Sequence, residues 1–267
     1  MDTLSWTPDA ECPRVFARLS GDHNPVHLDD EFARSAGFPS VIVHGMAVLG
    51  ASARAAHVLA PAGSVLRKLD VRFANPVLPG QRVSFSGEQK EGPDGVRVLL
   101  SAVLDDEKRL MNPATFTFGA RGGAYVDPPA AETAADAKDV AGEPFRFDAA
   151  AIAEYLAISA CTARAEGEGI PPMLGLLGMT GALERAFKGV QPEKAGTWVH
   201  LRQAASFFRP VQTDLDYRCR IQAARVVLRT APQGAHVSIP FVVEKAADGA
   251  LLASGQCVLL YAFREAA

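Results

Sequence analysis

Two side chains that commonly act as acid and base in catalysis, Asp22 and His27, lie five residues apart near the start of the chain. Residues 20–25, which contain the first of them, read Ser-Gly-Asp-His-Asn-Pro and are almost entirely turn-forming. Pro25 also prevents a helix from running through this segment. We therefore expect Asp22 and His27 to project from one short loop, where a carboxylate and an imidazole could hold a water molecule and move its protons.

The same segment contains a spacing that is typical of metal sites, because His23 and His27 stand four residues apart. That spacing brings two imidazoles together only on a helix, and Pro25 interrupts the helix. Cysteines do not suggest a metal either, since they form no Cys-x-x-Cys pair and have no histidines at zinc-finger spacing. They are Cys12, Cys161, Cys219 and Cys257. We expect no metal site, no cofactor and free thiols.

The elements that must position this loop occur twice along the chain. Residues 65–73 alternate apolar and polar side chains as a half-buried strand does, and an Asn-Pro-Val sequence follows them. Residues 198–208 form a second such strand, and an Arg-Pro-Val sequence follows it. More alternating segments come after each of these strands: residues 82–87, 96–104 and 114–118 in the first half, and residues 215–222 and 237–243 in the second.

Ahead of these strands, each half has a Gly-x-Pro turn and then one apolar helix, at residues 44–57 and 173–188. A mostly apolar helix is typical of a buried position. The sequence thus predicts an α+β fold in which an antiparallel sheet wraps around one helix, twice over. The expected domains are residues 1–121 and 144–267, and the Ala-, Asp-, Pro- and Gly-rich residues 122–143 form the linker.

Composition excludes several classes of partner. The chain has 267 residues, of which 48% are hydrophobic, so it can bury two cores. A formal net charge of -3 leaves no surplus of Lys and Arg for nucleic acid. Its apolar runs are shorter than the ~18 residues that cross a bilayer, and residues 1–9 carry no export signal. We expect a cytoplasmic protein with a small-molecule substrate and no membrane partner.

The segment from Phe16 to Ala36 resembles the signature of the R-specific enoyl-CoA hydratases, also called hydratase 2 or MaoC-like dehydratases. Its core reads aromatic-x-x-Leu-Ser-Gly-Asp-x-Asn-Pro-Val-His-x-Asp, and the Ala-Gly-Phe-Pro of residues 36–39 and the Val-His-Gly-Met of residues 43–46 follow it. The resemblance extends over most of the first half and more faintly over the second. It implies the double hot-dog fold, with the two halves paired as an internal pseudo-dimer, and two chains could pair further as a homodimer.

The resemblance also implies a reaction, the reversible hydration of trans-2-enoyl thioesters of CoA or acyl-carrier protein to R-3-hydroxyacyl thioesters. Asp22 and His27 would then hold the catalytic water. Gly45 would offer its N–H to the developing enolate oxygen at the start of the first buried helix, where the helix dipole favours negative charge. Asn24 would either orient the site or serve only the turn, and His44 would either contact the substrate or fix the helix start.

The second half lacks this motif. When residues 156–159 are aligned with residues 17–20, Cys161 takes the place of Asp22 and Glu166 that of His27. No histidine stands near Cys161 in the sequence to activate its thiol. We therefore expect the second half to be a scaffold that completes the acyl pocket.

Three glycines, Gly175, Gly178 and Gly181, recur at every third position of the second apolar helix. Glycine costs roughly 0.5–1 kcal/mol relative to alanine inside a helix, so the row calls for an explanation. Close packing of the helix is one explanation. The other is that the missing side chains leave a cavity that binds a long or bulky acyl chain.

Two alternative functions remain open at this point. A thioesterase could use the same fold, and so could a subunit that binds acyl thioesters without turning them over. The pairing of Asp22 with His27 favours proton transfer at a double bond.

Overall fold

One antiparallel sheet runs through the computed structural model, which describes residues 4–119, 127–129, 136–160, 170–186, 196–231 and 234–263. Its strand order is β1-β3-β4-β5-β2-β7-β11-β10-β8-β6, and β9 pairs with β10. The first half contributes β1 (Leu4–Trp6), β2 (Val65–Arg72), β3 (Val83–Gly92), β4 (Gly95–Leu104) and β5 (Arg109–Gly119). The second half contributes β6 (Val140–Ala141), β7 (Gly196–Phe207), β8 (Tyr217–Ile221), β9 (Val227–Ala231), β10 (Gly234–Lys245) and β11 (Leu251–Phe263).

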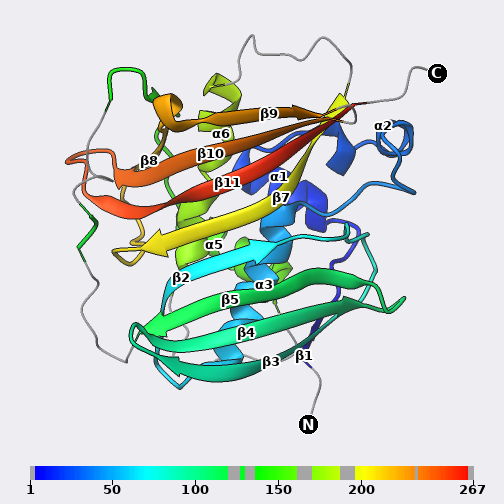
Figure 1. Ribbon diagram of the computed structural model, residues 1–267, viewed down its shortest axis with the longest axis horizontal. Helices are drawn as coiled ribbons and strands as arrows, with labels where there is room; N and C mark the ends of the chain where they lie inside the picture. The colour runs from blue at the N-terminus through cyan, green and yellow to red at the C-terminus, as the bar shows by residue number, and fades with distance from the viewer. Residues whose placement is uncertain are drawn as a thin grey trace.

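The halves meet where β2 pairs with β7, in a register that places Leu69 opposite Ala205 (Figure 1). From this junction outward, the strand order of the second half mirrors that of the first: β5 corresponds to β11, β4 to β10, β3 to β8 and β1 to β6. Strand β9 is an addition to the second half. A bidentate ion pair between Asp70 and Arg202, with N–O distances of 2.7 and 2.6 Å, also crosses the junction. The predicted double α+β architecture is confirmed.

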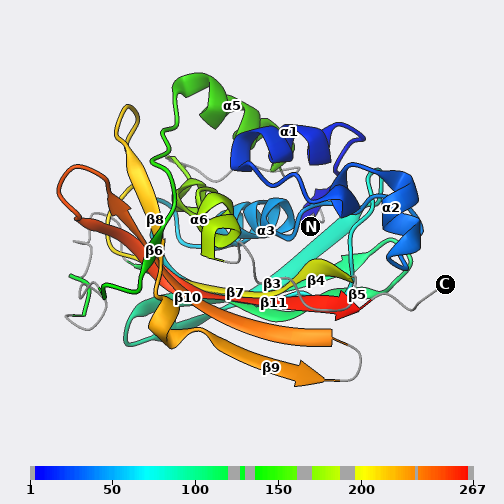
Figure 2. The ribbon, with the colours of Figure 1, turned by 90° about the horizontal axis from the view of Figure 1, so that it is seen from above.

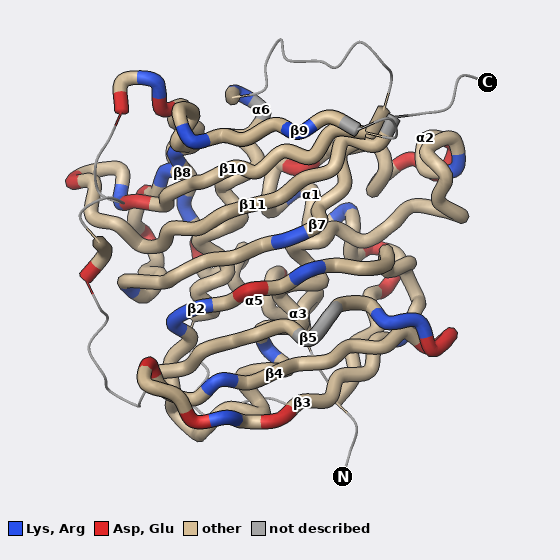
Figure 3. Tube along the Cα trace, in the orientation of Figure 1, with Lys and Arg blue, Asp and Glu red and all other residues tan. Residues whose placement is uncertain are grey.

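The helices gather on one face of the sheet, where α3 and α6 lie against the strands and α1 and α5 cover them (Figure 2). The α-helices are α1 (Cys12–Ser20), α2 (Asp30–Ser35), α3 (Gly45–Leu59), α5 (Ala149–Ile158) and α6 (Met179–Ala186). Short 3-10 helices are η1 (Pro25–His27), η2 (Pro172–Leu176) and η3 (Ala223–Arg225). Acidic and basic residues are interspersed along the strands (Figure 3), in keeping with the small net charge.

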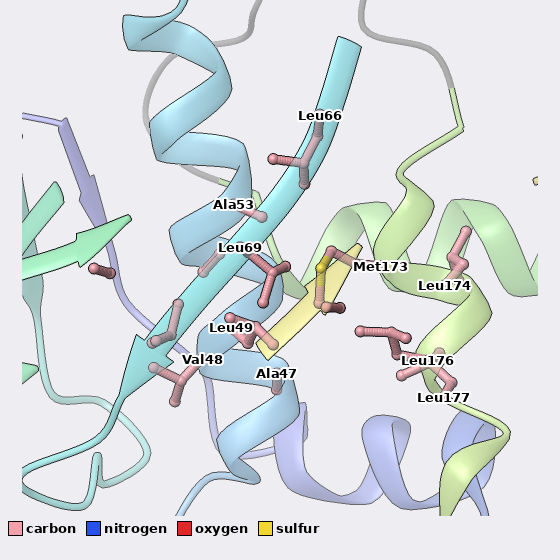
Figure 4. Close-up of a cluster of buried hydrophobic side chains, with 14 of the residues drawn as sticks. Ala47, Val48, Leu49, Ala53, Leu66, Leu69, Met173, Leu174, Leu176 and Leu177 are labelled. Carbon is pink, nitrogen blue, oxygen red and sulfur yellow. The ribbon is translucent and has the colours of Figure 1, made fainter. Parts of the chain in front are cut away.

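Helix α3 is buried, as its apolar sequence predicts. Leu49 is completely inaccessible, and its side chain meets Leu69 of β2 and Met173 of η2 in a core that both halves share (Figure 4). A side chain at Gly50 would collide with the hydroxyl of Tyr155, so glycine is required where α3 passes close to α5. The halves therefore share one hydrophobic core as well as one sheet.

Helices α1 and α5 end in the same way, which supports the alignment of the two halves. The Ser20 hydroxyl donates to the Phe16 carbonyl at 2.8 Å, and the Ser159 hydroxyl donates to the Tyr155 carbonyl at 2.7 Å. Each bond reaches back four residues at the last turn of its helix. The two halves thus match up to the residue at which the loop with Asp22 begins in the first half.

The end of the expected linker contains regular structure, although half of residues 122–143 lie outside the described residues. Strand β6 falls within this range and pairs with β8, and the Gly142 N–H donates to the Cys219 carbonyl at 2.9 Å. Asp139 also forms an ion pair with the buried Arg220. Folded structure in the second half therefore begins several residues before the expected boundary at residue 144.

The expected continuous helix at residues 173–188 is wrong, because η2 and α6 are separate elements and residues 187–188 lie outside the described residues. A Cβ on Gly178, between the two elements, would overlap the ring of Phe145. One on Gly175 would lie 2.5 Å from Leu252 Cδ2, whereas one on Gly181 would have no neighbour within 4 Å. Close packing therefore explains Gly175 and Gly178 but not Gly181.

Alanine substitutions at two of these glycines should have opposite effects on stability. The Phe145 ring also contacts Phe147 and Tyr217, so it cannot move freely to admit a methyl group at Gly178. We expect Gly178→Ala to lower the free energy of unfolding by about 1–3 kcal/mol. Gly181→Ala, the matched control, should raise it by up to about 1 kcal/mol. Urea denaturation of both variants measures this, and equal effects would contradict the packing explanation.

Candidate active site

A cavity of about 680 Å³ lies between the two halves. The first half lines it with the loop that carries Asp22 and His27 and with the start of α3 at Gly45. The second half lines it with α6, β7 and β11, including Leu183, His200 and Leu259. This volume is within the range of about 300–1,000 Å³ that is usual for small-molecule sites.

The loop is built by local capping interactions. Helix α1 stops at Gly21, whose left-handed φ of 72° lets its N–H donate to the Ala17 carbonyl. The Asp22 carboxylate then accepts from the Asn24 N–H at 3.2 Å. Asn24 in turn caps η1, where its side chain accepts from the Val26 N–H at 3.3 Å. The expected loop is therefore present, and its second part is a single 3-10 turn that ends at His27.

Two buried imidazoles stand behind the loop, and backbone carbonyls fix their protons. His27 Nδ1 donates to the Ile42 carbonyl at 2.8 Å, and His44 Nε2 donates to the Asp22 carbonyl at 3.0 Å. Since a carbonyl oxygen only accepts, the other nitrogen of each neutral ring, Nε2 of His27 and Nδ1 of His44, carries no proton. The rings stack with their centroids 3.8 Å apart. His44 thus supports His27 and the loop as well as capping α3.

Burial keeps both imidazoles neutral. Desolvation lowers the pKa of His27, and the nearby Asp22 carboxylate and the Ile42 carbonyl oppose this only in part. Desolvation and the neighbouring His27 lower the pKa of His44 to about 3. Near neutral pH, His27 Nε2 is therefore free to accept a proton.

Asn24 connects the loop to the second half. Its Nδ2 donates to the Trp198 carbonyl of β7 at 3.2 Å, and its Oδ1 accepts from the Thr197 hydroxyl at 3.5 Å. Asn24 therefore has the turn role and also links the loop to β7, whereas its role in orienting the site stays a prediction. The partners on β7 are more than 170 residues away in the chain, so local sequence patterns could not identify them.

Gly45 is the first residue of α3, as expected, and the first amides of a helix have no acceptor within it. A Cβ on Gly45 would lie 3.1 Å from both Cβ and Nδ1 of His200 on β7. Sequence reasoning did not single out His200, although it is a histidine within the strand that was expected to match β2. Desolvation is the main cause that lowers the pKa of His200, to about 4.

Two further groups of residues that the sequence singled out can be compared with the cavity. Cys161 and Glu166 lie in residues 161–169, outside the described residues. Gly175, Gly178 and Gly181 do not line the cavity, and α6 contributes Met179, Thr180 and Leu183 to its wall instead. The expectation that these glycines open the acyl cavity is therefore not met, because Phe145 and Leu252 fill the space beside two of them.

Asp22, His27 and His44 each offer one ligand atom, and these atoms all lie within 4.8 Å of one another. In the sequence, His23 stands at metal-site spacing from His27, whereas in the structure the imidazole grouped with Asp22 and His27 is that of His44. One nitrogen of each ring already donates to a backbone carbonyl, so each ring has one nitrogen left for a water molecule or another ligand.

Comparison with known proteins agrees with this geometry. Residues 7–104 match the family model of the MaoC like domain. The first half of the chain is thus similar to this family over 98 residues. The match contains the loop and α3, and so includes Asp22, His27 and Gly45.

Curated relatives are similar to the MaoC-like half over short stretches. Peroxisomal multifunctional enzyme type 2 of Drosophila melanogaster is 47% identical over 130 residues, which are 47% of this chain and 19% of that protein. Enoyl-CoA hydratase 2, peroxisomal, of Arabidopsis thaliana is 42% identical over 66 residues (24% and 21%). 3-hydroxyacyl-thioester dehydratase Y of Mycobacterium tuberculosis is 39% identical over 80 residues (29% and 28%). The chain therefore spans less than a third of the length of each of these relatives.

Solved structures extend the similarity beyond the MaoC-like half to the whole fold. A MaoC domain protein from Chloroflexus aurantiacus J-10-fl has a TM-score of 0.71 at 12% identity, over 98% of this chain and 93% of that one. A Mycobacterium tuberculosis protein with a double hotdog fold has a TM-score of 0.66 at 10% identity, over 97% and 94%. The chain thus has the double hot-dog fold. In the part that the structure describes, no helix is long and apolar enough to span a bilayer.

The neutral histidines predict that mild acid destabilises the fold. His44 and His200 have pKa values of about 3 and 4 in the fold and near 6.5 when unfolded, so between these values only the unfolded chain takes up their protons. The contribution of these two histidines to the free energy of unfolding is complete above pH 6.5 and is lost as the pH falls. From pH 7 to 5 we expect the free energy of unfolding to drop by about 2 kcal/mol for each histidine. Urea titrations at several pH values measure this, and a constant value would contradict it.

Proposed function

We propose that this protein is a hydro-lyase that reversibly adds water to trans-2-enoyl thioesters and forms R-3-hydroxyacyl thioesters. The single observation that carries the proposal is the pairing of the Asp22 carboxylate with the unprotonated Nε2 of His27 on one wall of the cavity between the halves. The similarity to two relatives, an enoyl-CoA hydratase and a 3-hydroxyacyl-thioester dehydratase, supports the same reaction.

In this mechanism the loop holds the reacting water. The Asp22 carboxylate and His27 Nε2 bind one water molecule, and His27 accepts a proton from it as the oxygen adds to the β-carbon of the enoyl chain. A proton is then delivered to the α-carbon, so the net change is the addition of H and OH across the double bond. Because the pair occupies one wall, water reaches one face of the substrate, in line with a single product stereoisomer.

The start of α3 stabilises the charge that develops during addition. Negative charge moves onto the thioester oxygen as the enolate forms, and the Gly45 N–H at the positive end of the α3 dipole would donate to it. The absence of a side chain at Gly45 leaves room for the His200 ring beside the start of α3. The substrate carrier is CoA or an acyl-carrier protein.

The second half supplies the wall for the acyl chain. The cavity side chains of α6 and β11 include Met179, Leu183 and Leu259, all of them apolar, and they face the loop of the first half across the cavity. An enoyl chain whose thioester oxygen accepts a hydrogen bond from the Gly45 N–H would extend toward these residues. Names of relatives include peroxisomal proteins, and the cytoplasmic location expected from the sequence remains a prediction.

The proposal predicts that each member of the pair is needed for hydration. We expect Asp22→Asn and His27→Asn to lower kcat by about 10²- to 10⁴-fold. Asparagine at position 27 can still donate to the Ile42 carbonyl but lacks the second ring nitrogen. Loss of the ultraviolet absorbance of crotonyl-CoA measures turnover, and His236→Ala, an exposed histidine on β10, is the control.

More than a tenth of wild-type turnover in either Asp22→Asn or His27→Asn would contradict the assignment. Release of free thiol from crotonyl-CoA by the wild type would instead indicate a thioesterase. Binding without either reaction would indicate a non-catalytic acyl-thioester binding subunit.

The position of α6 predicts how chain length is selected. Leu183 lies on the cavity wall, so Leu183→Trp should lower kcat/KM for long enoyl chains at least tenfold more than for crotonyl-CoA. Gly181→Ala, on the same helix but with no neighbour at its Cβ position, is the matched control and should not discriminate. If Leu183→Trp reduced both substrates equally while remaining folded, the acyl chain would not lie against α6.

A further inference from the structure

The second half contributes His200 to the immediate surroundings of Gly45, although it lacks the Asp-His motif. His200 lies on β7, and its exposed part faces the cavity. Its ring contacts Phe73 of the first half, with centroids 5.3 Å apart. His200 therefore lies at the junction of the halves, beside Gly45.

A bulge in β7 turns His200 toward α3. Arg202 pairs with Val258 of β11 and His200 pairs with Leu259, so the register shifts and Leu201 is left without a partner in β11. The Leu201 carbonyl instead accepts from the Phe73 N–H at 2.9 Å. Bulges of this kind change the direction of the neighbouring side chains and are frequent beside active sites.

The His200 ring is held in one orientation. Its Nε2 donates to the Arg202 carbonyl at 3.1 Å and lies 3.5 Å from the buried Cys257 thiol. Because Nε2 carries the proton, Nδ1 is the unprotonated atom, and this is the atom that faces Gly45. The ring cannot donate a proton from that side, so direct acid catalysis at Gly45 is not its role.

Contact distances show how closely His200 confines Gly45. A Cβ on Gly45 would be 3.1 Å from His200 Cβ and Nδ1 and 3.4 Å from Cγ, closer than side chains normally approach. The preceding residue, His44, is itself fixed, because its Nε2 donates to the Asp22 carbonyl at 3.0 Å. The start of α3 is thus held by a bonded histidine of its own half and is in close contact with a histidine of the other half.

From this geometry we propose that His200 is a positioning residue for the Gly45 N–H, supplied to the active site by the half without the motif. The inference rests on the proposed function of Gly45 as a donor to the enolate oxygen. Such a donor contributes to the rate only when it lies within hydrogen-bond distance of the oxygen in the transition state. A ring that fixes the first residue of α3 fixes that distance.

The kinetic effect of removing the ring distinguishes positioning from a simple wall. If His200 only lined the cavity, its loss would weaken substrate binding and raise KM. Loss of an interaction made in the transition state lowers kcat and leaves KM nearly unchanged. We therefore expect His200→Ala to lower kcat about tenfold with KM within about threefold of wild type, while His236→Ala changes neither.

A double-mutant cycle tests the contact itself. Gly45→Ala alone should lower kcat about 100-fold, because the new methyl group meets the His200 ring and displaces the amide. In Gly45→Ala/His200→Ala the ring is gone, and we expect kcat to recover about tenfold. The recovery is partial because residue 200 keeps its Cβ. If Gly45→Ala fails to fold, folding of the double variant is the rescue that the proposal requires.

The same four proteins should be compared by urea denaturation, which does not depend on turnover. His200→Ala should restore part of the stability that Gly45→Ala loses. Additive losses in both kcat and stability, or a kcat of His200→Ala within twofold of wild type, would overturn the proposal. A wild-type protein that does not hydrate crotonyl-CoA would refute the proposed function instead, and the stability cycle would still decide whether His200 confines Gly45.

Discussion

The pairing of β2 with β7 is the interaction on which the rest of the molecule depends. It joins two sheets into one and places α3, with the core around Leu49, under strands of both halves. Because the start of α3 then faces β7, the catalytic loop cannot form a complete site within its own half. Asn24 binds the Trp198 carbonyl, and Gly45 meets His200. The second half is therefore part of the proposed active site even without the motif.

Burial at this junction also determines the chemistry. An exposed imidazole is partly protonated near neutral pH, whereas desolvation keeps His27, His44 and His200 neutral. Backbone carbonyls that accept from one nitrogen of each ring select its tautomer. The fold thus keeps one nitrogen of His27 unprotonated, as the proposed base requires, at the expense of stability in acid.

The sequence predicted the parts that depend on local pattern. Alternation identified β2, β4, β7 and β10, and the apolar run identified α3, whose first residue is Gly45 as expected. The turn chemistry around Asn24 identified the loop. Short or edge elements such as β1, β6 and β9 carry too few residues for a periodic signal. The glycine row was misread as one helix, because the break at Gly178 depends on the ring of Phe145, 33 residues earlier in the chain.

Residues that act across the junction were beyond sequence reasoning for a different reason. His200 lies in a strand whose alternation is interrupted by a bulge. Its proposed role depends on its contact with Gly45, which only the folded structure brings beside it. Likewise, His44 is next to Gly45 in the sequence, yet its bond to the Asp22 carbonyl requires α3 to be buried beside the loop. In a fold made of two similar halves, a motif in one half marks where the reaction takes place. The residues that complete the site must be sought on the strand that the other half brings to the junction.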